Sequence, residues 1–374
     1  MLVRTLGSSL VAGGSEVDVF AHRIDNAGIN WFGHIDRGDP FAPQVDPASG
    51  VTTRQLRLTA AESTALRAYA RLRGADPLFE RLHAQVSTRR FAAQLSGADL
   101  IHRFGGNRMA LPTVRAARRL GRPVVVTPLA HAGVFDDDEL SARAYRAADL
   151  VVATTNADAD IYRGLGVAPE RVRVCPLPTD PPGPGDGARV RSEHEIAGPL
   201  VVFLGVRREN KRIPQLLDAA DILAARDPSV RVAVVGRGEP LRAHRPAIVD
   251  VGAVSEEDRN AWLHAADIVC LPSSDESFGL VVSEAWSLGV PVVTSDIPVL
   301  KERVTASGGG IATSVDPPAL AAALERLVSD ADLRRQMGRR GHEHWQRTES
   351  PESVAAWHRA AYAELLAARD QPAA

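Results

Sequence analysis

The chain has 374 residues, of which 45% are hydrophobic and 24% charged, a composition typical of a folded globular protein with two or three domains. Lys and Arg number 44 against 46 Asp and Glu, so the net charge is −2 and no nucleic-acid partner is expected. No apolar run approaches the ~18 residues of a membrane span, and the opening residues lack a signal-peptide core, so no transmembrane segment is expected.

The opening of the chain is predicted to be a helix. Leu2, Leu6 and Leu10 lie on one helical stripe, and the pair Gly13-Gly14 ends this helix before a strand-like run at 17–20. A parallel α/β domain normally opens on a strand, and that strand is usually central. We therefore expect the first sheet to lack its usual first strand and either to contain a gap or to be rearranged.

Residues 36–95 carry a weaker signal. Three prolines and a glycine predict a loop at 36–50, and residues 60–73 and 77–95 are predicted to be helical.

Short β-branched runs alternate with helical patterns along the chain. The runs are continuously apolar, as strands covered on both faces should be, and their alternation with helices predicts parallel sheets. The first set is 17–20, 100–102, 124–127, 150–153 and 171–176; the second is 200–204, 230–235, 268–271, 290–294 and 310–313. Cys175 and Cys270 lie inside such runs, which predicts reduced core residues and a cytoplasmic protein rather than a disulfide or zinc framework.

The segment 181–187, Pro-Pro-Gly-Pro-Gly-Asp-Gly, separates the two sets and cannot hold a helix or a central strand. It predicts an interdomain linker with a boundary near residue 185. The predicted fold is α/β, with two doubly wound, Rossmann-like domains facing a cleft, at 1–182 and 188–348. A C-terminal helix within 351–374 is predicted to cross back to the first domain through an apolar face with Trp357 and Tyr362. Ligands of such sheets bind beyond the carboxyl ends of the strands.

The stretch 272–286 carries the strongest functional signal. It follows a predicted strand and opens a helix whose first N–H groups, at 277–280, predict a site for an anion or a hydroxyl group. Glu276 and Glu284 are eight residues apart, or ~12 Å along a helix axis. That reach suits a sugar nucleotide, which has a polyhydroxyl group at each end and a diphosphate between them. Alternatively, Glu276 is an ordinary acid at a helix N-terminus and Glu284 a solvated helix residue.

Two further loops follow predicted strands. Residues 205–212 contain four basic side chains, among them Arg207, Arg208 and Lys211, placed to bind phosphate by charge-assisted hydrogen bonds. Residues 236–238, Gly-Arg-Gly, form a turn that lets a ligand approach the backbone closely. Each loop could instead be an ordinary solvated turn.

Other candidates carry less weight. The acidic run 136–139 could bind a cation, but an exposed helix cap is the preferred interpretation. His131 follows a predicted strand and could be functional or simply a satisfied histidine, and His102 could orient neighbouring backbone.

Taken in order, these motifs resemble the GT-B glycosyltransferases of family GT4, which carry a Glu-x7-Glu motif. The resemblance rests on residues 205–211, 234–238, 266–273, 276–285 and 289–293, and it covers essentially all of 195–345. The first domain is similar more loosely, through residues 99–102, 123–131 and 148–150.

The resemblance implies retaining, metal-independent transfer of a sugar, without a cofactor, from a nucleoside-diphosphate donor to a small-molecule or glycan acceptor. In the family the first Glu and the backbone after it hold the transferred sugar, which implies this role for Glu276, Ser277, Phe278, Gly279 and Leu280. The second Glu holds the ribose, which points to Glu284, and the basic residues bind the diphosphate, which points to Arg207, Arg208 and Lys211. The remaining implied roles are a nucleotide-side loop at Gly236, Arg237 and Gly238, catalytic roles for His131 and Glu276, and an acceptor-side role for His102.

The chain departs from the family pattern at two places. Val206 stands where the family usually has Arg, so Arg207 or Arg208 is expected to substitute for it, and Leu177-Pro178 replaces the usual Asn-Gly. With the missing first strand, these departures keep open a rival function, a non-catalytic nucleotide-sugar-binding partner subunit of a glycosyltransferase. A third possibility is a GT-B nucleotide-sugar epimerase.

Overall fold

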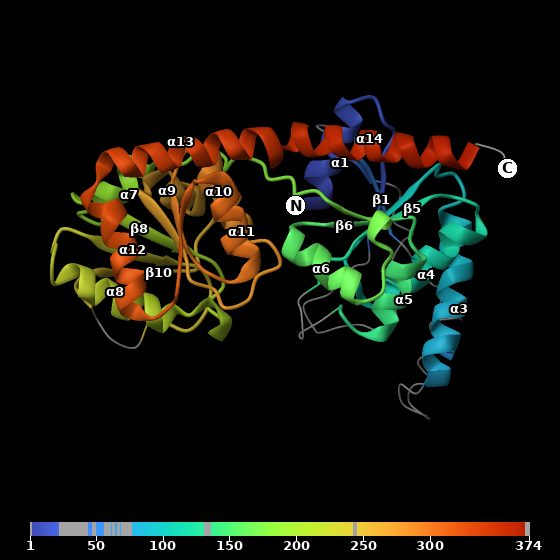
Figure 1. Ribbon diagram of the computed structural model, residues 1–374, viewed down its shortest axis with the longest axis horizontal. Coiled ribbons are helices and arrows are strands. Elements are labelled where there is room, and N and C mark those ends of the chain that lie inside the picture. The colour runs from blue at the N-terminus through green and yellow to red at the C-terminus, as the bar shows by residue number, and fades with distance from the viewer. Residues whose placement is uncertain are drawn as a thin grey trace. The chain divides into compact units, whose positions relative to one another are not determined.

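The computed structural model describes residues 2–21, 44–46, 50–55, 77–130, 136–241 and 245–370, with isolated positions at 61, 64, 65 and 68. The chain divides into two compact units (Figure 1). Unit 1 is Met1–Thr154, Asp158–Cys175 and Val354–Ala374, and unit 2 is Thr155–Ala157 and Pro176–Ser353.

Unit 2 is built on a six-stranded parallel sheet in the order β10-β9-β8-β11-β12-β13. The chain moves outward from β8 on one side and from β11 on the other, so the doubly wound order is confirmed for this unit. The strands are β8 (Leu200–Leu204), β9 (Arg231–Val235), β10 (Ile248–Gly252), β11 (Ile268–Leu271), β12 (Val292–Ser295) and β13 (Gly310–Thr313).

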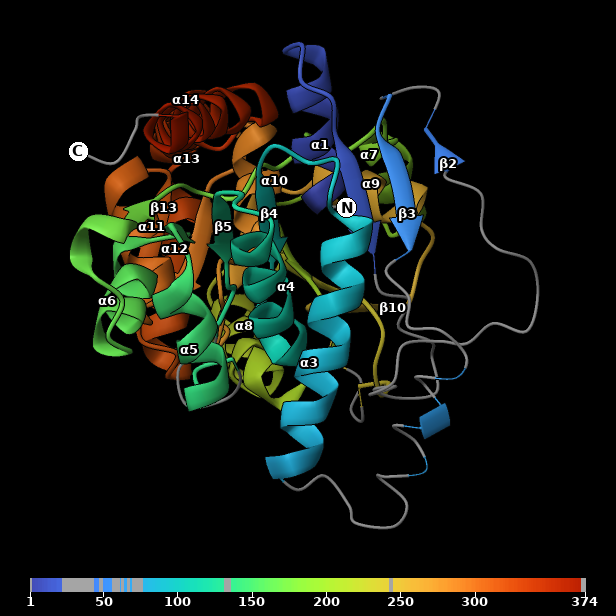
Figure 2. The ribbon, with the colours of Figure 1, turned by 90° about the vertical axis from the view of Figure 1, so that its right-hand side faces the viewer.

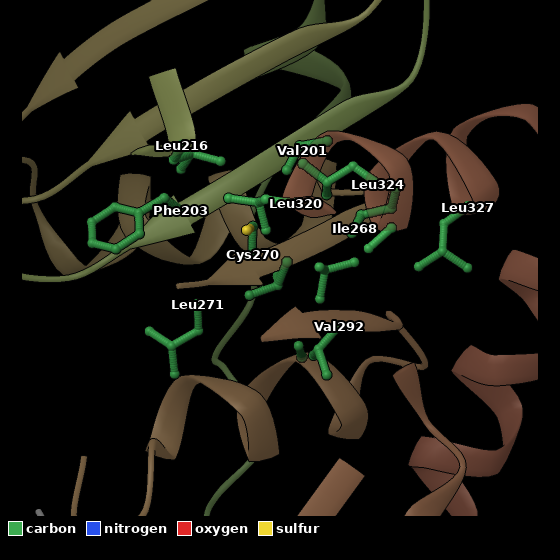
Figure 3. Packing of buried hydrophobic residues seen from close by; sticks show 14 of the residues in the cluster. Val201, Phe203, Leu216, Ile268, Cys270, Leu271, Val292, Leu320, Leu324 and Leu327 are labelled. Carbon is green, nitrogen blue, oxygen red and sulfur yellow. The ribbon is translucent and has the colours of Figure 1, made fainter. Parts of the chain in front are cut away.

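Helices cover both faces of this sheet because alternate strand residues point to opposite sides. Val201 and Phe203 join a buried cluster with Leu216 and Leu320 (Figure 3), whereas Leu200 and its neighbours pack in a second cluster with Trp262. The helices are α7 (Gly187–Glu193), α8 (Ile213–Ala224), α9 (Glu256–Ala265), α10 (Leu280–Ser287), α11 (Pro298–Ser307), α12 (Pro317–Ser329) and α13 (Ala331–Thr348), with the short 3-10 turn η2 (Glu209–Lys211).

Unit 1 contains two separate sheets among its described residues. One is parallel, in the order β4-β5-β6-β7, and the other has the order β1-β3-β2, in which β1 and β3 pair in parallel. Among the described residues, the four-stranded sheet runs in chain order without a reversal. The separation of β1 and β3 from β4 agrees with the expected gap. The strands are β1 (Asp18–Ala21), β2 (Gln44–Val45), β3 (Thr52–Gln55), β4 (Ile101–Phe104), β5 (Val124–Thr127), β6 (Leu150–Ala153) and β7 (Val172–Val174).

The four-stranded sheet of unit 1 is also covered on both faces. Val124 and Val126 pack in a cluster with α3, α4, α5 and α6, whereas Val125 packs with Leu6 of α1 and Val354 of α14. Figure 2 shows α1 beside β1 and β3, as predicted for a helix that opens the chain. The helices are α1 (Leu2–Ala12), α3 (Pro77–Gln94), α4 (Asn107–Arg119), α5 (Glu139–Ala147), α6 (Asn156–Gly164) and α14 (Pro351–Asp370), with a 3-10 turn, η1 (Pro169–Arg171). Most of the predicted helix at 60–73 lies outside the described residues.

The chain enters unit 2 at Pro176 rather than near residue 185, so the Pro-Gly segment belongs to unit 2. The physical reason is close packing against α9. A Cβ atom on Gly185 would lie 2.4 Å from the backbone nitrogen of Ala261, and one on Gly187 would lie 2.7 Å from that of Ala265. The glycines of this segment therefore allow backbone to approach backbone.

Both cysteines are free and buried, as predicted, and burial raises the pKa of each thiol. None of the helices in the described part of the chain has the length and apolar character needed to cross a bilayer.

Candidate functional site

The loops that follow β8 and β11 leave the same edge of the unit 2 sheet at the point where its strand order reverses. β8 and β11 are hydrogen-bonded neighbours, with Val201 opposite Ile268, and both strands run in the same direction. In a doubly wound sheet, ligands bind at this switch point. The topology therefore brings together the two loops that the sequence analysis selected, at 205–212 and 272–279.

The two loops are joined by an ion pair and by backbone contacts. Lys211 Nζ forms a salt bridge with the Glu276 carboxylate, and the two side chains are 18% and 13% exposed. The N–H of Ser274 donates to the carbonyl oxygen of Asn210 at 2.8 Å. Arg212, which follows Lys211, has a φ of 51°. This left-handed conformation is uncommon outside glycine, and such strain gathers at functional loops.

Helix α10 begins three residues later than predicted, at Leu280, because Gly279 is in the left-handed region with φ 79° and ψ 62°. A Cβ atom on Gly279 would lie 3.0 Å from Leu300 and 3.1 Å from Leu271. The N–H of Val282 donates to the Gly279 carbonyl at 2.9 Å, whereas the first N–H groups of a helix have no intrahelical acceptor and favour an anion or a hydroxyl oxygen. This turn lies directly after Glu276 in the chain.

Glu284 lies in the second turn of α10, and its side chain is 5% exposed. Arg259 of α9 donates to the Glu284 carboxylate at 2.5 Å. Burial raises the pKa of Glu284, and the neighbouring guanidinium acts in the opposite direction. Glu284 is therefore a paired, buried acid rather than a solvated helix residue.

The glycine turn after β9 packs tightly against the loop after β8. The N–H of Gly236 donates to the Gly252 carbonyl at 2.7 Å, and the N–H of Arg207 donates to the Arg237 carbonyl at 2.7 Å. The Arg207 side chain is 4% exposed, forms a salt bridge with Asp250 and donates to the Val234 carbonyl at 2.9 Å.

The Arg207 side chain is thus buried in contacts with the edge of the sheet, whereas Arg208 is exposed. Of the two arginines that the sequence analysis left open, only Arg208 has an exposed side chain, so it stays the candidate for phosphate.

The unit 1 candidates occupy different positions. His102 lies in the middle of β4, with Nδ1 2.6 Å from the Tyr362 hydroxyl and Nε2 2.8 Å from the Thr127 hydroxyl. These contacts make it a bridge between the sheet and α14. His131 lies outside the described residues. Leu129, two residues before it, has a φ of 58°, a strained value for a branched residue.

The acidic run 136–139 contains a helix cap, the interpretation preferred from the sequence. Asp138 accepts the N–H of Ser141 at 2.8 Å at the start of α5.

His358 of α14 gives unit 1 a pH dependence. It is 3% exposed, its Nδ1 lies 2.9 Å from the Val354 carbonyl, and burial lowers its pKa to about 4. In the unfolded chain the His358 side chain takes up a proton near pH 6.5, whereas in the folded protein it stays neutral down to about pH 4. The contribution of neutral His358 to the free energy of unfolding is therefore complete above pH 6.5 and is lost as the pH falls toward 4. The loss amounts to about 3 kcal/mol.

We expect His358→Leu to lose less thermal stability than the wild type between pH 7.5 and pH 4.5. Its matched control is His264→Leu, which replaces an exposed histidine of α9. Equal acid-induced shifts in the melting temperatures of the wild type and His358→Leu would refute this prediction.

Sequence reasoning missed Arg259, which binds Glu284 in the second turn of α10, and Arg303, which binds the turn before this helix. Arg303 donates to the carbonyls of Phe278 and Gly279 at 2.7 Å and 3.2 Å. Neither arginine lies in a recognisable motif, because each meets its partner only through the packing of α9 or α11 against α10.

Two family models match the chain. The model described as "Glycosyl transferases group 1" matches residues 188–344, and the one described as "Glycosyl transferase 4-like domain" matches residues 2–178.

Several curated bacterial proteins named D-inositol 3-phosphate glycosyltransferase are similar in sequence. The one from Nocardia farcinica is 33% identical over 219 residues, which cover 53% of this chain and 49% of that protein. The one from Geodermatophilus obscurus is 30% identical over 293 residues, covering 70% of this chain and 64% of that protein. The chain thus spans about half the length of the first of these relatives and somewhat more of the second.

Solved structures with the same fold include sucrose-phosphate synthase from Thermosynechococcus elongatus. It has a TM-score of 0.70 and 23% identity, and the match covers 98% of this chain and 93% of that one. The Anabaena protein HepE, solved in complex with UDP and glucose, has a TM-score of 0.64 and 18% identity, with 85% and 87% coverage. Both likenesses concern the fold, which is GT-B.

Proposed function

The chain belongs to the GT4-type glycosyltransferases, and on that premise we propose that it transfers a sugar from a nucleoside-diphosphate donor to a hydroxyl acceptor. The observation that carries this proposal is the Lys211–Glu276 ion pair at the switch point of the unit 2 sheet. It places a cation for phosphate and an acceptor for sugar hydroxyls side by side. The complex of the Anabaena protein with UDP-glucose supports a nucleotide-sugar donor.

Each part of the donor has a matching group in this site. Lys211 and the exposed Arg208 neutralise the diphosphate, and the backbone amides from Ser277 to Leu280 donate hydrogen bonds to the transferred sugar. Glu276 accepts hydroxyl groups of the sugar, and Glu284 accepts those of the ribose. The residues 236–238 line the nucleotide side.

The proposed reaction retains the configuration at the anomeric carbon. The bond from that carbon to the phosphate oxygen breaks, and a bond to the acceptor oxygen forms on the same face of the sugar. The proton of the acceptor hydroxyl passes to the departing phosphate oxygen, so no protein nucleophile takes part. Lys211 and Arg208 stabilise the charge that develops on the diphosphate, a role that requires no metal ion in this mechanism.

The acceptor is proposed to be a small hydroxylated molecule. The names of the curated relatives support this class, since they are inositol phosphate glycosyltransferases.

Lys211→Met is expected to weaken the binding of nucleoside diphosphates by about tenfold or more. One charge-assisted hydrogen bond contributes about 1.5 to 3 kcal/mol, and a factor of ten corresponds to about 1.4 kcal/mol. Titration calorimetry with UDP, GDP, ADP and dTDP checks this. The matched control is Lys301→Met, which removes an exposed lysine of α11. Equal affinities in the two variants would exclude a role for Lys211.

The proposed activity is tested by incubating the protein with glucose and mannose conjugates of the four nucleoside diphosphates, with and without a polyol acceptor. Acceptor-dependent release of the nucleoside diphosphate is the expected result. Binding without release would favour the non-catalytic partner subunit, and conversion of the donor to an isomer without any acceptor would favour an epimerase.

A further inference from the structure

Arg303 of α11 lies buried behind the glycine turn that begins α10, and its side chain is 4% exposed. One terminal nitrogen donates to the carbonyl of Phe278 at 2.7 Å and to that of Gly279 at 3.2 Å, and the other donates to the Ser283 hydroxyl at 2.7 Å. The guanidinium also stacks on the Phe278 ring, 3.7 Å from its centroid. One side chain thus binds the turn and the first part of α10.

Glu349, the residue that ends α13, holds this guanidinium in place. Arg303 donates to both carboxylate oxygens, at 2.8 Å and 2.9 Å, and the Glu349 side chain is 1% exposed. Burial alone would raise the pKa of Glu349, but Arg303, His344 and Ser283 together hold it below its usual value, so the carboxyl group is ionised. The backbone of Glu349 is also anchored, because its carbonyl accepts the N–H of Thr179 at 3.0 Å.

Stability does not account for a charge pair at this depth. Removing two charges from water is costly, and apolar residues of similar volume often replace a buried ion pair without loss of stability. The arrangement differs from a simple ion pair because the guanidinium also binds two successive backbone carbonyls. Those carbonyls belong to the loop that carries the candidate site.

The direction of these carbonyls fixes the direction of two amide groups. In a trans peptide the C=O and the N–H point in opposite directions, and no cis peptide is found among the described residues. The Phe278 carbonyl shares its peptide plane with the N–H of Gly279, and the Gly279 carbonyl shares its plane with the N–H of Leu280. Because Arg303 draws both carbonyls into the core, both N–H groups point away from it.

We propose that Arg303, held by Glu349, is a positioning residue that aims the amides of Gly279 and Leu280 at the donor. This inference rests on the proposed function, since it assumes that the turn faces a nucleotide sugar. Arg303 touches neither donor nor acceptor and acts only through the orientation of the two peptide planes.

The test compares single variants with a double variant. Arg303→Met and Glu349→Met each leave one buried charge without its partner and are expected to lower the melting temperature. The double variant Arg303→Met with Glu349→Met removes both charges and is expected to recover most of that loss. Its turnover is nevertheless expected to stay at least about tenfold below the wild type, because the Phe278 carbonyl loses its Arg303 donor and the Gly279 carbonyl keeps only the N–H of Val282, at 2.9 Å. Arg303→Lys keeps the positive charge and three N–H donors on a single nitrogen, and it is expected to retain more of the rate than Arg303→Met.

A structural readout accompanies turnover. Hydrogen exchange is measured over residues 277–283 and 205–212, with and without whichever of UDP, GDP, ADP and dTDP binds most tightly. In the double variant the nucleoside diphosphate is expected to protect 205–212 as in the wild type but to lose its protection of 277–283.

A folded double variant with turnover within about threefold of the wild type and unchanged protection would overturn the positioning role. If the double variant does not fold, wild-type turnover in Arg303→Lys with no change in protection would do the same, because one lysine nitrogen with three N–H groups cannot serve both carbonyls, Ser283 and Glu349 as the two guanidinium nitrogens do. A wild type that shows neither turnover nor protection would instead refute the proposed function, so the two failures are distinguishable.

Discussion

Glu276→Gln is expected to lower the turnover of the donor by about 100-fold while the protein remains folded. The substitution removes the negative charge of Glu276. In the wild type this charge pairs with Lys211, and we propose that it strengthens the hydrogen bonds from the sugar hydroxyls. The Gln oxygen still accepts hydrogen bonds, but a neutral acceptor contributes about 1 to 1.5 kcal/mol less than a charged one for each bond, so two such bonds raise the barrier by about 2 to 3 kcal/mol. Steady-state release of the nucleoside diphosphate measures the effect.

The matched control is Glu325→Gln, which neutralises an acid of α12 that pairs with Arg226 on the surface. That variant is expected to retain wild-type turnover. Circular dichroism should show that both variants are folded, because Glu276 is partly exposed and its ion pair contributes little to stability. Turnover in Glu276→Gln within about tenfold of wild type would contradict its assignment to the sugar.

Gly236→Ala is expected to destabilise unit 2 by more than about 3 kcal/mol, among the largest effects of any single substitution in this unit. Gly236 has a φ of 136°, a region essentially closed to residues with a side chain. A Cβ atom there would lie 1.9 Å from the carbonyl oxygen of Gly205, which belongs to the backbone and cannot rotate away. The shift would also displace the loop that carries Lys211.

Gly252→Ala provides the control because it shares the positive φ but lacks the clash. Its φ is 71°, and a Cβ atom would meet no atom within 4 Å. We expect a loss of only about 1 to 2 kcal/mol, the cost of the left-handed conformation alone. Urea unfolding followed by hydrogen exchange in unit 2 measures both values. Similar losses in the two variants would show that close packing at Gly236 does not determine stability.

The second half of the fold could be predicted from the sequence because its strands are continuous apolar runs. β8, β11 and β13 have the predicted limits, and all the residues of β11 are buried. β10 was missed because it is the edge strand of the sheet, with partly exposed residues and Asp250 in its interior. The start of α10 was predicted too early because a glycine at positive φ delays the helix.

The candidate site could be predicted only where its residues follow strands. Lys211 and Glu276 each follow a strand end, and the sheet order then brings them together. Arg259, Arg303 and Glu349 lie within or at the end of helices, and only the tertiary packing reveals what they contact. The salt bridge between Arg207 and Asp250 could not be predicted either, because Asp250 lies in β10, the edge strand that the sequence analysis missed.

The acids of this site are already neutralised before any ligand arrives. Glu276 pairs with Lys211, Glu284 with Arg259, and Asp250 with Arg207. On the proposed function, a diphosphate that draws Lys211 away from Glu276 frees that carboxylate to accept hydroxyl groups of the sugar. In this proposal, Lys211 binds the phosphate in the same step in which the Glu276 carboxylate is released to bind the sugar hydroxyls. When the anion carries no sugar, the Glu276 carboxylate loses Lys211 and gains no hydroxyl partner. This costs binding free energy, so we expect the intact donor to bind more tightly than the nucleoside diphosphate alone.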